Sequence, residues 1–214
     1  GYASLAANTT GSQNVAVGAL AGDAITTGSE SVALGSSSLS ANTEGTANTA
    51  IGAYALRNDT LGSRSVAVGH QALNAQNFTS ATSAYNVAVG ANAGAAVTTG
   101  VNNTLIGGLA GDAITTGTVN VAVGTSALGA LTTASYNTGI GYAALSTNTT
   151  GAQNTAVGYS ALTAATGADN TAIGSQGLSS VTSGTYNTAV GRSAGQLVTT
   201  GVQNTFVGGL SGDA

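Results

Sequence analysis

The chain has 214 residues and a formal net charge of −4 at pH 7, and only 5% of its residues are charged, against roughly 25% in a typical soluble domain. It contains no Cys, which excludes disulfides and thiolate metal sites. Its basic side chains besides one histidine are Arg57, Arg64 and Arg192, too few for a basic patch. We therefore expect no nucleic-acid partner, and no apolar run approaches the ~20 residues of a membrane span.

The composition favours β-structure. Pro is absent and Gly occurs 33 times. Proline cannot donate a hydrogen bond to a strand ladder, so a chain made of consecutive strands excludes it. The sequence therefore predicts strands throughout, separated by glycine turns.

A repeated phrase, Asn-(Val/Thr)-Ala-(Val/Ile)-Gly, runs along the whole chain. Of the 12 spacings between its final glycines, counted from Gly1, ten are 17 residues, one is 21 and one is 16. This period predicts an all-β, parallel β-solenoid, a single array of about 12 coils over residues 1–214. The marker glycines that define the array are Gly18, Gly35, Gly52, Gly69, Gly90, Gly107, Gly124, Gly141, Gly158, Gly174, Gly191 and Gly208.

The columns of the repeat predict side-chain directions. The residue before each marker glycine is aliphatic, as in Val17, Ile51 and Val157, and we expect this column and the Val/Thr column two residues earlier to face the coil interior. The alanine between them is then expected to face a close neighbour. The column that opens the phrase is Asn in ten coils, and its stacked amides predict a hydrogen-bonded ladder, represented by Asn14, Asn48 and Asn154.

A second set of columns follows each marker glycine. Four residues after it comes Leu in eight coils and Gly in five. Where Leu is missing and the chain continues, an aliphatic residue stands three positions later, which indicates compensation of volume within one core layer; these residues are Ile25, Val97, Ile114 and Val198. A second glycine ten residues after the marker predicts a turn with positive φ. Each coil is thus expected to hold two short strands and two glycine turns.

Few aliphatic side chains are available to each coil, which favours additional burial between chains. With the alanine column as the contact surface, we expect a side-by-side homotrimer. The chain begins at a marker glycine and stops in mid-coil at Asp213-Ala214, without a polar cap. We therefore expect a segment of a longer fibre, or ends that stack on other copies as an open head-to-tail polymer.

The phrase Asn-x-Ala-(Val/Ile)-Gly resembles the head repeats of YadA-type trimeric autotransporter adhesins. The longer phrase from Gly141-Tyr142 through Asn154-Thr155-Ala156-Val157-Gly158 is similar to shaft repeats of phage-type tail fibres. The resemblance covers the whole chain and implies a left-handed parallel β-roll with three chains per rod. It also implies an extracellular, cell-surface or virion location.

Catalytic and metal chemistry have few candidate residues. His70 is the only histidine, so a His-based triad or multi-His site within one chain is impossible, and its position after Gly69 predicts an exposed turn residue. Asp23 and Asp112 share a column but lie five coils, roughly 24 Å, apart. Glu30 and Glu44 are expected to be solvated turn charges. The sequence predicts no enzyme, no cofactor and no metal.

Two features remain as candidates for binding. Exposed tyrosines can stack on sugars or pack between chains, and the four-residue insertion between Asn74 and Tyr85 is where a solenoid would carry a binding loop. The leading hypothesis is a structural extracellular fibre, an adhesin head or tail-fibre shaft, that self-associates and mediates attachment to a surface glycan or receptor. The alternative is an ice-binding β-solenoid.

Overall fold

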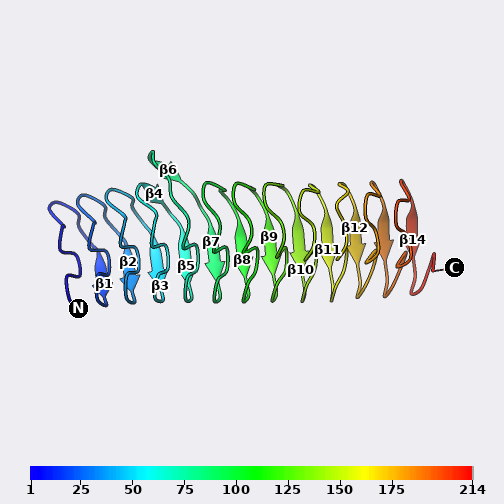
Figure 1. Ribbon diagram of the computed structural model, residues 1–214, viewed down its shortest axis with the longest axis horizontal. Helices are drawn as coiled ribbons and strands as arrows, with labels where there is room; N and C mark the ends of the chain where they lie inside the picture. The colour runs from blue at the N-terminus through cyan, green and yellow to red at the C-terminus, as the bar shows by residue number, and fades with distance from the viewer. Residues whose placement is uncertain (214) are drawn as a thin grey trace.

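The computed structural model describes residues 1–213 and is an all-β solenoid, with no helix in that range (Figure 1). Every repeat contributes one three-residue strand, and two successive repeats each add a two-residue strand. The strands are β1 (Val15–Val17), β2 (Val32–Leu34), β3 (Thr49–Ile51), β4 (Gly62–Ser63), β5 (Val66–Val68), β6 (Thr82–Ser83), β7 (Val87–Val89), β8 (Thr104–Ile106), β9 (Val121–Val123), β10 (Thr138–Ile140), β11 (Thr155–Val157), β12 (Thr171–Ile173), β13 (Thr188–Val190) and β14 (Thr205–Val207).

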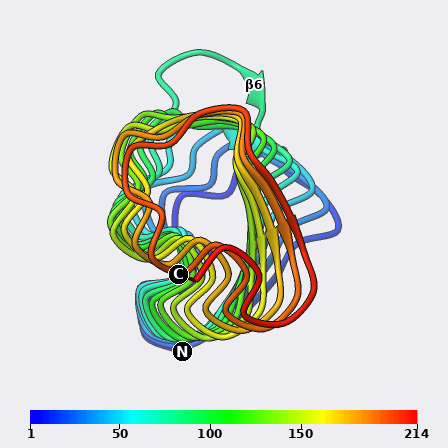
Figure 2. The same ribbon diagram turned by 90° about the vertical axis from the view of Figure 1, so that its right-hand side faces the viewer.

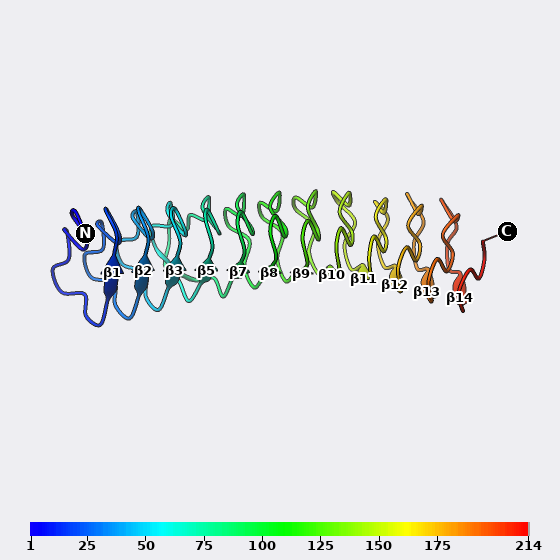
Figure 3. The ribbon, with the colours of Figure 1, turned by 90° about the horizontal axis from the view of Figure 1, so that it is seen from below.

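Twelve strands form one parallel sheet in chain order, and only β4 and β6 stand apart as a second small sheet. The chain therefore completes eleven turns between β1 and β14, and at ~4.8 Å per strand the sheet is about 53 Å long. The coils are evenly spaced when the rod is seen from below (Figure 3). Seen from the C-terminal end, the chain runs clockwise as it advances toward the viewer, so the solenoid is left-handed (Figure 2).

Strand pairing keeps every column in register. Val15 pairs with Val32, and Val17 pairs with Leu34; the same alignment continues across the 21-residue repeat, where Val66 pairs with Val87. The 16-residue repeat is absorbed equally, because Thr155 still pairs with Thr171. Insertion and deletion thus fall in the turns, and the strand column is conserved in space along the rod.

The predicted direction of the strand side chains is wrong. The alanine column lies inside the coil, as with Ala50 and Ala156, which are both fully buried. The flanking aliphatic column points outward: Val17 is 61% exposed and Ile51 is 36% exposed, while Val157 is half-buried. The Val/Thr column accompanies it on the outside, and the Asn column accompanies the alanine inside.

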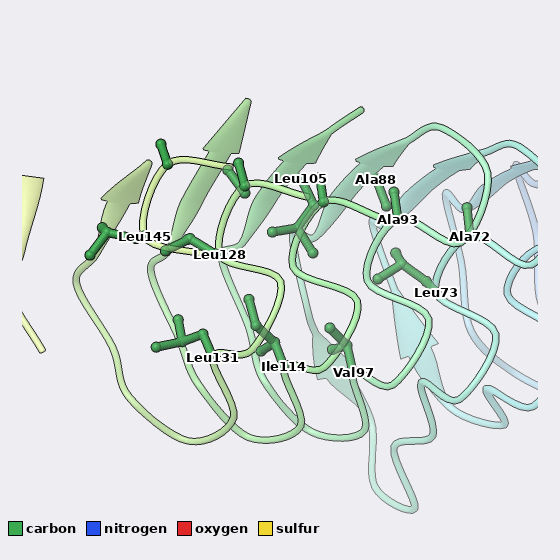
Figure 4. Close-up of a cluster of buried hydrophobic side chains, with 14 of the residues drawn as sticks. Ala72, Leu73, Ala88, Ala93, Val97, Leu105, Ile114, Leu128, Leu131 and Leu145 are labelled. Atoms are coloured by element: carbon green, nitrogen blue, oxygen red, sulfur yellow. The ribbon is translucent and has the colours of Figure 1, made fainter. Parts of the chain in front are cut away.

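The reason for this reversal is the narrow interior. The Leu four residues after the marker glycine packs directly against the inward column, since a Cβ on Gly139 would lie 3.3 Å from Leu128 Cγ. Some coils also bury a second large side chain three residues later, such as Leu131. Leu128, Leu145 and Leu162 are all completely buried, and in Figure 4 the side chains of Leu128 and Leu145 lie inside the coils. A strand opposite this leucine can present only a methyl group without overpacking. The strand therefore turns its alanine inward and its two flanking side chains outward.

Volume compensation within the core is confirmed. Where Gly replaces the leucine, the later aliphatic residue occupies the same space. A Cβ on Gly111 would lie 2.8 Å from Ile114 Cδ1 and 2.8 Å from Leu105 Cδ2. Leu105 itself replaces the inward alanine of its strand and is fully buried. The side chains of Leu105 and Ile114 therefore fill the space that a leucine at position 111 would occupy.

The second glycine that most coils carry allows close approach and does not adopt positive φ. A Cβ on Gly28 would lie 2.5 Å from the carbonyl oxygen of Gly45, and one on Gly100 would lie 2.3 Å from that of Gly117. Positive φ is found instead at the marker glycines, for example 129° at Gly124. The predicted positive φ at this position is therefore wrong, and the glycine allows contact between stacked backbones instead.

The expected second strand in each coil is also absent from the described residues, apart from the β4–β6 pair. Left-handed residues alternate there: φ is 55° at Ser126 and 54° at Leu128. The N–H of Ser126 donates to the preceding coil at Gly108, whereas that of Leu128 donates to the following coil at Ala144. Inter-coil bonding therefore persists without strand geometry, and it holds non-glycine residues in a conformation that costs about 1–2 kcal/mol each.

The inward alanine can be tested with a matched pair of substitutions. We expect Ala156→Leu to destabilise the fold by about 1–3 kcal/mol, because the filled interior cannot take three more carbons. Val157→Leu, one residue later on the outer side, is expected to change stability by less than about 0.5 kcal/mol. Urea denaturation of both variants measures the difference. Equal effects would contradict the orientation described above.

Candidate interaction surface

The outward side chains of the twelve-stranded sheet form one continuous surface, which we call the outer strand face. It consists of two columns of twelve residues, one on each side of the inward column. The column before the marker glycines contains only Val, Ile and Leu. The other column contains five Val and seven Thr. None of these twenty-four side chains is charged.

This face is exposed to an unusual degree for apolar side chains. Ile106, Ile140, Ile173 and Val190 are between 38% and 44% exposed although both neighbouring strands flank them. The apolar column alone extends about 53 Å at ~4.8 Å per strand. Continuous apolar patches of this extent are rare on monomeric proteins and mark sites of association. The outer strand face is therefore the strongest candidate for a functional surface.

A ladder of asparagine amides fixes the interior side of the same strands. Asn120 Nδ2 donates to Asn103 Oδ1 at 3.2 Å and to the carbonyl of Ala134 at 3.0 Å. Its Oδ1 accepts the backbone N–H of Asn137 at 3.0 Å. All three asparagines are fully buried, so the predicted ladder is confirmed. It satisfies backbone groups at the turn before each strand and thereby holds the outer strand face regular.

A second ladder runs along the threonines that stand eight residues after most marker glycines. Thr98 Oγ1 donates to the carbonyl of Thr115 at 3.1 Å, and Thr115 Oγ1 donates to that of Thr132 at 3.2 Å. The pattern continues at Thr132 to Thr149. The Thr pairs of the sequence therefore serve stacking between coils at a turn, and only the threonines inside the strands belong to the outer strand face.

The insertion forms a loop that projects beyond the outline of the other coils (Figure 2) and carries β6, which pairs with β4 through Gly62 and Thr82. Sequence reasoning located this loop but missed the polar group beneath it. Asp59 is fully buried. Its carboxylate accepts hydrogen bonds from the N–H groups of Gly62 and Phe78 at 3.0 and 3.1 Å, and from Gln76 Nε2 at 2.6 Å.

Gln76 also repairs a gap in the asparagine ladder. Ser65 stands where most coils have Asn, and its shorter side chain leaves space in the interior. Gln76 Nε2 donates to Ser65 Oγ at 3.1 Å, and Gln76 Oε1 accepts from Asn86 Nδ2 at 2.9 Å. The signal in the sequence is a polar column position, Asn42, Asp59 and Gln76 in consecutive coils, just before the insertion. This buried group anchors the loop and has no exposed chemistry.

The aromatic and basic side chains lie on the surface turns. Arg57 lies 5.2 Å from the centre of the Tyr54 ring, and His70 meets the same ring edge-on at 6.1 Å. Arg64 contacts Ser83 Oγ and lies 5.8 Å from the centre of the Tyr85 ring. His70 is exposed as predicted, and so are the tyrosines considered for sugar binding except Tyr54, which is half-buried; the exposed ones are Tyr2, Tyr85, Tyr136, Tyr142, Tyr159 and Tyr186.

Two tyrosines stack on each other. The Tyr142 and Tyr159 rings are 5.6 Å apart with an angle of 10° between their planes, so each covers one face of the other.

The acidic residues considered in the sequence form no site. Glu30 and Glu44 are exposed, as expected. Burial raises the pKa of Asp112, partly offset by hydrogen bonds from its own backbone N–H and that of Ala113. Within residues 1–213 there is no surface pocket and no cluster of three potential metal ligands.

The described part of the chain contains no helix that could span a membrane. Comparison with protein-family models, with curated proteins and with solved structures found no match. The outer strand face and the repeat itself are therefore the features of the chain that point to a function.

The contribution of the asparagine ladder can be measured. We expect Asn120→Ala to lower the free energy of unfolding by about 2–3 kcal/mol, because the buried N–H of Asn137 and the carbonyl of Ala134 lose their partners. Asn58→Ala, at an exposed turn position, is the control and should change it by less than about 0.5 kcal/mol. Chemical denaturation of the two variants compares them. A small effect at Asn120 would mean that the ladder is dispensable.

Proposed function

We propose that this chain is a structural rod, a segment of an extracellular fibre that self-associates through its outer strand face. The observation that carries the proposal is the uncharged apolar column that faces outward along all twelve strands and is exposed at seven of them. Burial of apolar area at about 25 cal/mol per Å² favours association of such surfaces. The resemblance to adhesin heads and tail-fibre shafts supports the same role, in which attachment to a glycan or receptor would use the exposed tyrosines or the loop.

The surface available for association differs from the one expected from the sequence. The alanine column cannot be a contact between chains, because residues such as Ala50 and Ala156 are inside their own coil. The homotrimer hypothesis therefore requires that the Val, Ile and Thr columns face the other chains. These columns are continuous and in register from strand to strand, which suits the side-by-side packing of rods.

Self-association is tested by the solution mass, measured by size exclusion with light scattering over a wide range of concentration. We expect a mass that is a multiple of 20.2 kDa. Three chains would support the homotrimer, and two would support a paired rod. An open-ended series of large species would indicate polymerisation through the ends. A monomer at every concentration would contradict the proposed function.

Ice binding is the second candidate, and the threonines of the outer strand face favour it. Thr138, Thr155, Thr171 and Thr188 stand in register on consecutive strands, each beside an outward aliphatic residue. The hydroxyl and methyl groups therefore repeat at ~4.8 Å along the rod, and an uncharged surface of such regularity could match a lattice of water. The adjacent Thr pairs at the turn are not part of it.

A freezing assay decides this alternative. If the chain binds ice, the solution should show thermal hysteresis, and the double variant Thr171→Lys/Thr188→Lys should lose it because two charged side chains interrupt the lattice. Val66→Lys/Val87→Lys serves as the control, since it alters strands outside the threonine rows. Absence of hysteresis in the unmodified chain would rule ice binding out.

A further inference from the structure

The outer strand face changes character along its length. In the column that begins each strand, five of the first seven residues are Val, whereas all of the last five are Thr. We name the outward side chains of β1, β2, β3, β5, β7, β8 and β9 the valine segment, and those of β10 to β14 the threonine segment. The second column is aliphatic in both segments, so the difference lies in the hydroxyl groups.

Those hydroxyls determine what each segment can do. A hydroxyl buried without a hydrogen-bond partner costs about 1–3 kcal/mol. The threonine segment would bury five of them in an interface, whereas the valine segment would bury two, at Thr49 and Thr104. Water therefore suits the threonine segment, and a dry contact suits the valine segment. The two ends of one face are built for different neighbours.

We propose that the valine segment binds the valine segment of a second copy of this chain, with the two rods antiparallel and the threonine segments left in water. This inference rests on the self-association proposed above. A twofold contact of this kind is self-complementary, and no charged side chain on either face opposes it. A parallel pair would bring the threonine segments together, whereas an antiparallel pair directs them to opposite ends.

The exposed area of the valine segment suits a weak contact. Full burial of a Val or Ile side chain removes roughly 60–120 Å² from water, and the outward residues of the valine segment include Val15 at 51%, Val17 at 61% and Ile106 at 38% exposure. Ten of the fourteen outward side chains are half-buried, so each copy contributes about 350 Å². The total of about 700 Å² is below that of a standard-size interface, so a weak pairing that appears only at high concentration is expected.

Charge substitution in matched pairs tests the location of the contact. Val66→Lys/Val87→Lys and Thr171→Lys/Thr188→Lys place the same two charges in the same column on neighbouring strands, once in each segment. Sedimentation of the full chain measures the dissociation constant of the pair. We expect the valine variant to weaken pairing by at least about 100-fold and the threonine variant by less than about threefold. Circular dichroism and thermal unfolding confirm that both variants keep the solenoid.

Orientation has its own readout, because the chain has no natural cysteine. In an antiparallel pair of valine segments, β1 of one copy faces β9 of the other. A mixture of Val15→Cys and Val121→Cys chains should therefore form disulfide-linked dimers under mild oxidation, whereas Val15→Cys alone should not. Cross-linking of Val15→Cys with itself would overturn the antiparallel arrangement.

The outcomes separate this inference from the proposed function. Equal loss of association in both lysine variants, or loss in the threonine variant only, overturns the valine contact but leaves a self-associating rod. A mass of three chains does the same. A monomeric unmodified chain overturns both.

Discussion

In-register stacking of parallel coils is the constraint on which the rest of this structure depends. Because each strand pairs residue for residue with the next, a side chain chosen at one position is repeated every ~4.8 Å along the rod. A favourable side-chain contact then recurs along the whole stack, as the asparagine and threonine ladders show. An unfavourable choice would be repeated as well, which explains the near absence of charge from the strands and from the interior.

Stacking also determines how the chain tolerates variation. The inserted residues and the missing residue lie in turns, and the strands on both sides remain aligned. Where a column is interrupted inside the coil, a neighbouring residue fills the space: Ile114 and Leu105 surround Gly111, and Gln76 bridges the gap at Ser65. Buried Asp59 compensates for the largest interruption, the insertion, because its carboxylate joins the turn before β5 to the start of the projecting loop.

The narrow interior has a direct consequence for function. A strand that presents alanine to the leucine of its own coil must place its flanking β-branched side chains outside, where they form a long apolar surface in water. The ladders keep that surface in register, and a regular uncharged surface suits association with other rods or contact with an ordered lattice. The distribution of Val and Thr along it gives its two ends different affinities for water. Function would thus follow from the surplus of apolar groups that the core cannot accommodate.

The sequence by itself determined the solenoid, because the period of 17 residues, the register of the marker glycines and the exchange of Leu for Ile at positions such as Gly111 and Ile114 are visible without coordinates. It also determined the asparagine ladder and the place of the loop. Only the tertiary structure decided which face of each strand is inside. Period-2 alternation separates Ala50 from Thr49 and Ile51 but does not say which set is buried, and that choice depends on the space left by the opposing leucine. Burial of Asp59, the role of the second glycines in backbone contact and the left-handed residues that replace a second strand were likewise settled by close packing between coils, which no single repeat records.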